Sequence, residues 1–543
     1  MSNAIYHVPK ATNEVVLNYA PNSPEKNALR AALKNARSTV QEIPMHIGGK
    51  HVFTAEKLAI TPPYDHKTVI AHASMGDASH VEAAIAAALA AKPNWENMAW
   101  QARAAIFLKA ADLLSTKYRA RMNAATMLGQ SKNIYQSEID AIAEFADFLR
   151  FNVQYMTEIY NQQPVSSALI WNQVEYRPLE GFVFALTPFN FTAIAGNLCA
   201  APAMLGNVIV WKPADTQIYS AQVIMEIFEE AGLPDGVINL IYGDGPTIGN
   251  VIFHHKDFAG LHFTGSTAVF RSLWKTIGEN LDKYVSYPRI VGETGGKDFI
   301  FAHPTADVPA LATAMIRGAF EFQGQKCSAA SRAYVPKSLW KATKTLLVNT
   351  LKEIKTGSPE DFTNFVNAVI DARAYNKITQ YIEFARSQED CEIISGGKYS
   401  NEIGYFIEPT VIATSNPKTR TMVEEIFGPV LTIFIYEDKN VEKTLDLLDT
   451  TSDYALTGAI FAKERGVIEH LQQRLRYAAG NFYINDKPTG AVVGQQPFGG
   501  GRASGTNDKA GSILNLYRWI SPRTVKEALV PPTDYRYPFM QEA

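Results

Sequence analysis

Residues 181–211 run GFVFALTPFNFTAIAGNLCAAPAMLGNVIVW and contain no charged side chain. This run is longer than the ~20 residues that a membrane-spanning helix requires. Three asparagines and two prolines interrupt it, however, and these residues disfavour a span through lipid. We therefore predict a buried strand–loop–helix–strand unit of an α/β domain and no membrane association, because buried parallel strands form continuous apolar runs.

The alternation of short apolar strands and helices continues downstream of this run. Strands are predicted at residues 182–186, 208–211, 237–242, 260–263 and 289–291. The helices between them are predicted at residues 194–205, 221–231, 247–254 and 268–277. This order is typical of a doubly wound parallel sheet. After residue 294 a helix at 308–322 and a strand at 332–336 begin a second α/β pattern, which predicts a second domain.

The segment upstream of the apolar run has a different character. Residues 79–160 follow a helical period, and residues 169–177 alternate between apolar and polar side chains. We predict a β-ribbon at 169–177 that ends at Pro178. An exposed ribbon needs a partner that covers its edge, so this segment favours an oligomer.

Composition places the chain among folded proteins and excludes several classes of partner. With 543 residues, 46% of them hydrophobic and 19% charged, the chain is globular and long enough for two or three domains. The net charge of −3 provides no basic surface, so nucleic acid is not an expected partner. The cysteines Cys199, Cys327 and Cys391 are too few for a disulfide framework and indicate a reducing compartment.

The N-terminal stretch gives an expectation about location. Residues 1–15 carry neither an apolar signal-peptide core nor an Arg-rich amphipathic segment. We therefore expect a cytoplasmic protein, and the mitochondrial matrix after removal of a transit peptide is the alternative. Either compartment agrees with the sparse cysteines.

A cysteine with small neighbours and a carboxylate in a glycine-rich turn are the candidates for catalysis. Cys327 lies in QKCS at 325–328, and Glu293 lies in VGETGGK at 291–297. A thiolate can form a thioester, and a carboxylate can activate the water that releases the acyl group. We therefore predict an acyl-transfer enzyme. Taken alone, a buried structural thiol explains Cys327 equally well, and a turn or capping carboxylate explains Glu293.

Three loops at strand ends are candidates for nucleotide binding. Residues 243–249, GDGPTIG, are one residue too long for the dinucleotide fingerprint, and a plain strand-to-helix turn explains them better. Residues 263–267, FTGST, present hydroxyls and N–H groups at a helix N-terminus, which suits a pyrophosphate or an ordinary N-cap. Lys212 and Asp215 end a strand, where they would contact a ribose or form a charged solvent loop.

Seven ordered motifs give the chain a resemblance to the aldehyde dehydrogenase superfamily over nearly its whole length. They are TPFNF at 187–191, WKPAD at 211–215, FTGST at 263–267, GETGGK at 292–297, GQKC at 324–327, EIFGP at 425–429 and PFGG at 497–500. Within the superfamily the chain resembles the 1-pyrroline-5-carboxylate dehydrogenases, through GQKCSA at 324–329, TGAVVGQQPF at 489–498 and ASGTNDK at 503–509. The resemblance implies an α/β fold with a Rossmann-type NAD domain, an α/β catalytic domain and a β-ribbon oligomerisation flap.

The resemblance also implies catalytic roles and a reaction. Cys327 matches the nucleophile, Glu293 the general base, and Asn190 the oxyanion-hole side chain that acts with the backbone N–H of Cys327. The implied reaction is NAD-dependent oxidation of L-glutamate γ-semialdehyde to L-glutamate in proline catabolism. Oxidation of another short semialdehyde is the alternative. No metal is expected.

NAD is the implied cofactor, and ten residues match its contacts. They are Thr187, Lys212, Asp215, Gly265, Ser266, Thr267, Ala268, Val269, Glu425 and Phe427. Asp215 favours NAD over NADP, because a carboxylate accepts a hydrogen bond from a 2′-OH and repels a 2′-phosphate. The chain has Phe270 where many members of the superfamily have glycine, so we expect different packing where this helix meets the cofactor.

Five residues match the end of the site that binds the small-molecule substrate. They are Phe191, Ser328, Gly490, Ala491 and Phe498. The Ser328 hydroxyl and the backbone N–H groups of Gly490 and Ala491 can bind a carboxylate. Phe191 and Phe498 either wall the aliphatic stem or belong to the core.

The resemblance implies a division into domains. Residues 1–157 and 181–293 would bind NAD, residues 294–504 would form the catalytic domain, and residues 158–180 and 505–543 the oligomerisation flap. We expect a homodimer or a multiple of dimers.

Two other classes of function stay open. A CoA-acylating aldehyde dehydrogenase usually lacks the general base, so Glu293 argues against it. A structural lens protein on this fold would tolerate the loss of Cys327 or Glu293, and both residues are present.

Overall fold

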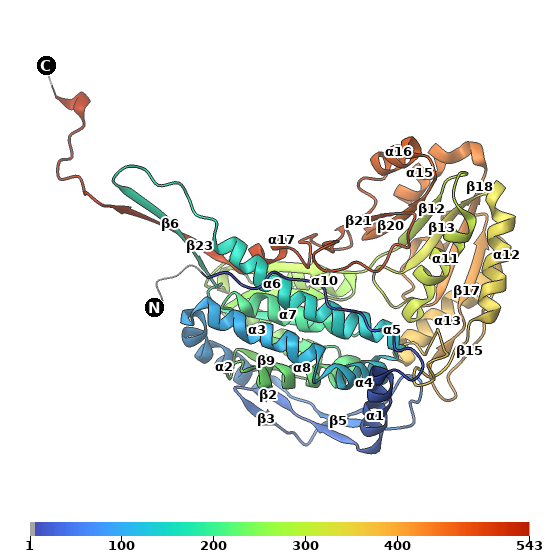
Figure 1. Cartoon of the computed structure of the whole chain (residues 1–543), viewed down its shortest axis with the longest axis horizontal. Helices are drawn as coiled ribbons and strands as arrows, with labels where there is room; N and C mark the ends of the chain where they lie inside the picture. Colours follow the sequence, from blue (N-terminus) through green and yellow to red (C-terminus); the bar gives the residue numbers. More distant parts are fainter. Residues whose placement is uncertain (1–5, 542–543) are drawn as a thin grey trace.

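The computed structural model describes residues 6–541 and contains two seven-stranded sheets and a projecting two-stranded ribbon (Figure 1). The first sheet has the order β11-β10-β7-β8-β9-β2-β3. Its strands are β2 (Met45–Ile47), β3 (Lys50–Val52), β7 (Phe182–Thr187), β8 (Val208–Pro213), β9 (Ile238–Leu240), β10 (Phe258–Thr264) and β11 (Arg289–Glu293). The five strands from β11 to β9 are parallel, which confirms the predicted doubly wound arrangement.

The uncharged run at 181–211 forms the centre of this sheet. It contains β7, helix α7 (Thr192–Met204) and β8, as predicted, and every residue of β8 is buried. Helix α7 packs on β7 and β8, and helices α6 and α3 pack behind it. Among residues 6–541, no helix is long and apolar enough to cross a membrane. The run is apolar because protein surrounds it.

Helices surround the sheet, and most of them come from the N-terminal part of the chain. They are α1 (Pro24–Ser38), α2 (Ala78–Asn97), α3 (Trp100–Ser115), α4 (Arg119–Gln130), α5 (Ile134–Ser137), α6 (Phe145–Tyr160), α8 (Ile218–Ala231), α9 (Gly245–His254) and α10 (Thr267–Glu279). A seven-residue π-helix, η1 (Glu138–Glu144), joins α5 to α6. Inserted π-turns are rare and concentrate at functional sites, and η1 faces one of the cavities described below.

The second sheet has the order β14-β17-β18-β13-β12-β20-β21. Its strands are β12 (Asp298–Ala302), β13 (Ala330–Pro336), β14 (Cys391–Ser395), β17 (Thr410–Thr414), β18 (Val430–Tyr436), β20 (Thr457–Phe461) and β21 (Asn481–Ile484). All neighbours are parallel except β14 and β17. The main helices around it are α11 (Val308–Phe320), α12 (Lys337–Glu353), α13 (Ala372–Ser387), α15 (Val441–Thr450) and α16 (Arg465–Arg474). This confirms the second α/β pattern expected after residue 294.

The predicted ribbon forms an antiparallel pair that extends away from the body of the molecule (Figure 1). Strand β6 (Ile170–Arg177) pairs with β23 (Ser521–Ala528) along its whole length, from Arg177 opposite Ser521 to Ile170 opposite Ala528. The segment at 169–177 is thus one strand, and its partner comes from the C-terminal tail.

Two boundaries and the composition of the first sheet are the informative differences from the predictions. Strand β9 is shorter than the expected 237–242, because the chain leaves the sheet at Tyr242 and Gly243 bridges Gly76 instead. Helix α11 ends at Phe320 and not at 322, because Phe322 and Gln323 take left-handed backbone angles, with φ of 50° and 55°. The first sheet is also mixed, since the hairpin β2–β3 adds two antiparallel strands at its edge.

Candidate active site

Cys327 lies in a loop between the end of α11 and the start of β13. The left-handed turn after α11 leads into Gly324, which has a φ of 66°. A Cβ on Gly324 would lie only 2.2 Å from the carbonyl oxygen of Gly428. Glycine is therefore required at position 324, where the loop passes close to the backbone of Gly428. Cys327 itself is 8% exposed. Burial first, and then the charge of nearby carboxylates, raises the pKa of its thiol well above the ordinary value.

Two cavities meet at Cys327. One has a volume of about 460 Å³ and lies along the C-terminal ends of β7 and β10. The other has a volume of about 250 Å³ and lies between η1 and the segment 487–498. Cys327 lines both. Its sulfur is thus placed to react with a molecule in the smaller cavity while a second molecule occupies the larger one.

The larger cavity is where a nucleotide cofactor fits. Six of the ten residues expected to contact NAD line it, together with the candidate oxyanion residue Asn190: Thr187, Gly265, Ser266, Val269, Glu425 and Phe427. The other four, Lys212, Asp215, Thr267 and Ala268, do not line it. Open α/β sheets bind nucleotides at the carboxyl ends of their strands, and this cavity has that position.

The N-terminus of α10 forms one wall of the larger cavity. Ser266 caps the helix, and its Oγ accepts a hydrogen bond from the Val269 N–H at 3.3 Å. The first N–H groups of a helix carry a partial positive charge that favours phosphate. Phe270 sits just behind this turn, stacked on Phe263 with ring centroids 5.3 Å apart. Its ring occupies the space that a Cβ on Gly292 would fill, which is the altered packing expected from Phe270.

Lys212 and Asp215 lie at the end of β8, outside the lining of the cavity. The Lys212 ammonium is 3.1 Å from a carboxylate oxygen of Asp215, and the Asp215 side chain is half exposed. Asp215 is next to Ala214, and Lys212 is two residues before it; Ala214 does line the cavity. The pair is therefore close to the cavity, and the charges of Lys212 and Asp215 offset each other.

Glu425 and two basic residues face the larger cavity from the second sheet's side. A Glu425 oxygen accepts the Gly296 N–H at 2.9 Å, and burial raises the pKa of this carboxyl. Lys377 donates to the Glu425 carbonyl at 2.9 Å, and Arg373 lies one helical turn away on α13. Sequence reasoning missed Lys377 and Arg373, because nothing in α13 distinguishes them from the other exposed basic residues of an amphipathic helix.

Glu293, the candidate base, is the last residue of β11, is partly exposed and lines neither cavity, although its neighbours Thr294 and Gly295 line the larger one. Burial raises the pKa of its carboxyl well above the ordinary value, and Lys509 opposes this shift. One carboxyl oxygen has no hydrogen-bond partner. The charge of Glu293 is also among the causes that raise the pKa of Cys327, so the two groups are electrostatically coupled. A buried carboxyl with a raised pKa is suited to accept a proton.

Asn190 lies against the loop that carries Cys327. Its side-chain N–H donates to the carbonyl of Gln325 at 3.2 Å. Asn190 is buried and lines the larger cavity together with Cys327. The Asn190 amide thus lies against the backbone of the loop that carries Cys327.

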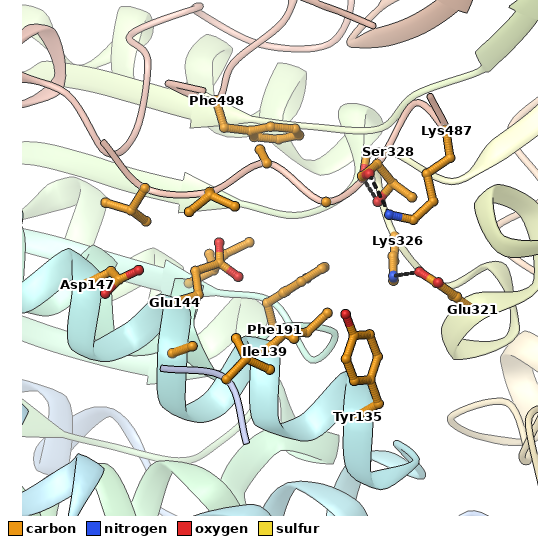
Figure 2. A pocket seen from close by; sticks show the side chains of 18 of the residues that line it. Tyr135, Ile139, Glu144, Asp147, Phe191, Glu321, Lys326, Ser328, Lys487 and Phe498 are labelled. Atoms are coloured by element: carbon orange, nitrogen blue, oxygen red, sulfur yellow. Dashed lines mark hydrogen bonds and ion pairs between the residues drawn. The ribbon is translucent and has the colours of Figure 1, made fainter. Parts of the chain in front are cut away.

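The smaller cavity brings together all five residues expected at the substrate end: Phe191, Ser328, Gly490, Ala491 and Phe498. Figure 2 shows Phe498 on one side of it and Phe191 on the other, with Ser328 and Lys487 at one end. The Ser328 hydroxyl is 2.8 Å from that of Thr489. Gly490 has a φ of 98°, a backbone conformation that residues with a side chain adopt poorly.

A family model described as "Aldehyde dehydrogenase family" matches residues 52–525. The chain belongs to the aldehyde dehydrogenase family. Two relatives named delta-1-pyrroline-5-carboxylate dehydrogenase, mitochondrial, are similar to it over almost its whole length. The one from Dictyostelium discoideum is 52% identical over 98% of this chain and 96% of the relative. The one from Mus musculus is 46% identical over 98% of this chain and 95% of the relative.

Solved structures of the family have the same fold. The Delta-pyrroline-5-carboxylate dehydrogenase from Mycobacterium tuberculosis, solved bound with NAD, is 48% identical, has a TM-score of 0.97 and matches 100% of both chains. The 1-pyrroline-5-carboxylate dehydrogenase from Thermus with bound NAD is 30% identical, with a TM-score of 0.90, over 96% of this chain and 100% of that one. The predicted aldehyde-dehydrogenase-like fold is confirmed.

Two charged residues that the sequence did not predict, Lys487 and Glu144, also line the smaller cavity. Lys487 donates from Nζ to the Thr489 carbonyl at 3.2 Å, at the same end of the cavity as Ser328. Glu144, the last residue of η1, points into the space below Phe498 (Figure 2). Burial raises the pKa of the Glu144 carboxyl to about 8. Lys487 stands two residues before the TGAVVGQQPF motif, and this closeness is the one signal that could have identified it.

Two buried ion pairs hold the walls of the aldehyde dehydrogenase site. Lys132 is 2.6 Å from Asp140, and the Asp140 carboxylate also accepts the first N–H groups of α7, from Thr192 and Ala193. The Lys132 ammonium lies 4.2 Å from the ring centroid of Phe191. These contacts fix α7, and with it Phe191, against η1. On the other side, Lys326 pairs with Glu321 at 3.1 Å.

Proposed function

We propose that this aldehyde dehydrogenase oxidises L-glutamate γ-semialdehyde, the open form of 1-pyrroline-5-carboxylate, to L-glutamate with NAD. The observation that carries the proposal is the position of Cys327 between two cavities, the smaller of which ends in hydroxyl, backbone N–H and ammonium donors. Such donors suit a short aldehyde with a carboxylate at its far end. The names of the similar proteins support the same substrate.

Cys327 is the proposed nucleophile. Its thiolate attacks the aldehyde carbon, forms a carbon–sulfur bond and leaves the carbonyl oxygen negatively charged. The Asn190 amide and the backbone N–H of Cys327 hold this oxyanion. The loss of one such donor costs about 10²–10³ in rate. Because burial favours the neutral thiol, ionisation of Cys327 is the first requirement of the reaction.

NAD, when bound in the larger cavity, accepts the hydride from the substrate carbon. The Gly265–Ser266 turn at the N-terminus of α10 would hold its phosphates, and Glu425 and Phe427 would contact the nicotinamide end. The proposed preference for NAD rests on Asp215, which repels a 2′-phosphate and also neutralises Lys212. Both effects weaken the binding of NADP.

Glu293 completes the reaction as general base. The acyl group is held on Cys327 as a thioester, and Glu293 removes a proton from the water that attacks it. The carbon–sulfur bond then breaks, and L-glutamate leaves while Cys327 recovers its thiolate or thiol. The unpartnered oxygen of Glu293 is free to accept that proton. This role argues against a CoA-acylating enzyme, which transfers the acyl group to a thiol and needs no water-activating base.

The substrate is bound through both groups on its α-carbon. Ser328, Lys487 and the N–H groups of Gly490 and Ala491 receive the carboxylate, and Glu144 faces the α-ammonium. Phe191 and Phe498 enclose the methylene stem. Hydrogen bonds to charged groups contribute about 1.5–3 kcal/mol each. Another short semialdehyde is the alternative substrate, and it would use the carboxylate end alone.

The division into domains and the assembly are part of the proposal. Residues 1–157 and 181–293 form the NAD-binding domain, residues 294–504 the catalytic domain, and residues 158–180 and 505–543 the flap. The ribbon β6–β23 extends from the body, and within the described residues it has no third strand (Figure 1). Side chains of Gln163 and Ser166 bond to the backbone of β6 on its outer edge, whereas β23 pairs with β6 alone. An exposed strand edge favours pairing with a second copy, so we propose a homodimer or a multiple of dimers.

One steady-state screen tests the function. The enzyme is given L-glutamate γ-semialdehyde and a set of aldehydes without a carboxylate, each with NAD and with NADP. The proposal requires NADH and L-glutamate to form in equal amounts, with NAD preferred. An enzyme that uses NADP better than NAD overturns the role of Asp215. One that shows no activity with the semialdehyde overturns the substrate.

A further inference from the structure

The edge of the first sheet carries two histidines and a carboxylate in close contact, far from the active-site residues in the fold. Strands β2 and β3 form a hairpin whose two-residue turn is Gly48-Gly49, both with positive φ. This tight turn places His46 directly opposite His51, with ring centroids 4.5 Å apart. Glu229, near the end of α8, reaches the same point. Figure 1 shows β2, β3 and α8 together at this side of the molecule.

The three side chains present three ligand atoms to one point. His46 Nδ1 is 2.7 Å and His51 Nε2 is 3.4 Å from the same oxygen of Glu229. All ligand atoms of the group lie within 4.8 Å of one another. Among residues 6–541, this is the one group of three or more His, Cys, Asp or Glu side chains with that geometry. Two imidazoles and a carboxylate are a ligand set for zinc, which accepts both kinds of atom at about 2.0–2.2 Å.

The hydrogen bonds around His46 orient its ring so that Nδ1 faces Glu229 and Nε2 faces Gln222. Gln222 donates from its amide nitrogen to Glu226 at 3.2 Å, which directs its amide oxygen to His46 Nε2 at 2.8 Å. In the tautomer in which Nε2 donates to this amide oxygen, the lone pair of Nδ1 points toward the Glu229 oxygen 2.7 Å away and is available to a metal ion.

We propose that this position binds a divalent transition metal of the zinc class, with His46 Nδ1, His51 Nε2 and Glu229 as protein ligands and water in the remaining place. A metal-bound histidine usually donates its other ring N–H to an oxygen acceptor, which fixes the tautomer. In this site the Gln222 carboxamide oxygen would accept from His46 Nε2 and leave the lone pair of Nδ1 free for the metal. His46 is buried, so one ligand is already in place. His51 and Glu229 are partly exposed and can adjust to the metal.

The proposed metal joins elements that are distant in the sequence. Strand β3 is the last strand of the sheet and is held by β2 alone. A metal bound to His51 and Glu229 would attach this edge hairpin to α8. Binding to the folded state alone would raise the melting temperature in proportion to the logarithm of the metal concentration. The site is therefore structural, and it leaves Cys327 and Glu293 untouched.

Metal titration of the full-length protein tests the proposal. Zn²⁺ is titrated into the Cys327→Ala protein, because the Cys327 thiolate is itself a soft ligand that would compete. We expect one zinc to bind and Tm to rise with zinc concentration. His51→Ala and Glu229→Gln, added to Cys327→Ala, should each weaken binding by about tenfold or more and abolish the rise in Tm. Both residues are partly exposed, so these variants should fold.

His80→Ala is the matched control. His80 is also paired with a carboxylate, that of Asp77 at 2.8 Å, but this exposed pair has no third ligand. His80→Ala should leave zinc affinity unchanged. Zinc binding that is equally strong in His51→Ala, or no zinc binding at all, would overturn the proposal.

Discussion

Ser328 Oγ lies 2.8 Å from Thr489 Oγ1, although 161 residues separate the two in the chain. The contact joins the loop of the nucleophile to the loop that closes the substrate cavity. It turns two hydroxyls toward the end of the cavity where Lys487 also lies (Figure 2). We therefore propose that Ser328, the residue next to Cys327 in the chain, is part of the receptor for the far end of the substrate.

Ser328→Ala tests this receptor. The substitution removes one hydrogen bond to the substrate carboxylate, so kcat/KM for L-glutamate γ-semialdehyde should fall roughly 10- to 100-fold, mainly through KM. Pentanal, which has no carboxylate, serves as the control substrate and should be oxidised almost as before. An equal loss with both aldehydes would mean that Ser328 supports Cys327 and not the substrate.

Glu144→Gln tests recognition of the α-ammonium. Glutamine keeps the size of the side chain and removes the carboxyl, which has a pKa of about 8 and which a bound ammonium would hold in its ionised form. We expect KM for L-glutamate γ-semialdehyde to rise about tenfold or more, because a charge-assisted hydrogen bond is lost. The matched substrate is 5-oxopentanoate, which has the carboxylate and lacks the amino group. Its KM should change little, and a rise as large as that for the semialdehyde would refute the assignment.

Glu293→Gln separates the two halves of the reaction. Hydride transfer precedes hydrolysis, so the variant should still release a burst of NADH close to one per active site. Steady-state turnover should then be slow, because no base activates the water. Rapid-mixing absorbance at 340 nm measures both phases. Cys327→Ala should show neither phase. Turnover of Glu293→Gln at the wild-type rate would remove Glu293 from the mechanism.

The same variant makes a prediction about pH. Burial raises the pKa of both the Cys327 thiol and the Glu293 carboxyl, so each group gains its reactive, ionised form only as pH rises. Activity should therefore increase with pH and fall on acidification. The negative charge of Glu293 also raises the pKa of Cys327. The midpoint of the burst rate against pH should thus move to lower pH in Glu293→Gln, and a midpoint that stays in place would show that the two groups are uncoupled.

Local pattern and motif spacing predicted the central features well. The uncharged run at 181–211 predicted a buried unit containing β7, α7 and β8, because strands that are buried on both faces form continuous apolar runs. The five residues predicted to contact the substrate come from motifs that stand far apart in the chain, and they line one cavity. The ribbon strand at 169–177 was predicted from its alternation, and the structure pairs it with β23 of the C-terminal tail.

The remaining features depend on contacts that no local pattern encodes. The end of α11 was misplaced because Phe322 and Gln323 take left-handed angles that favour glycine or asparagine, and tertiary packing holds them there. Glu144 was missed because its orientation depends on the π-helix η1, which shifts the face that a regular helix would present. The edge hairpin of His46 and His51 was missed because short antiparallel strands leave little periodicity.

The account rests on a carboxylate receptor opposite Cys327, and one ratio measures it most directly. The kcat/KM for L-glutamate γ-semialdehyde with NAD is divided by that for pentanal, under the same conditions. Unpaired donors in the cavity penalise the aldehyde without a carboxylate, so the ratio should be on the order of 10² or more. A ratio near one would contradict the proposed substrate, whereas the membership of the chain in the aldehyde dehydrogenase family would be unaffected.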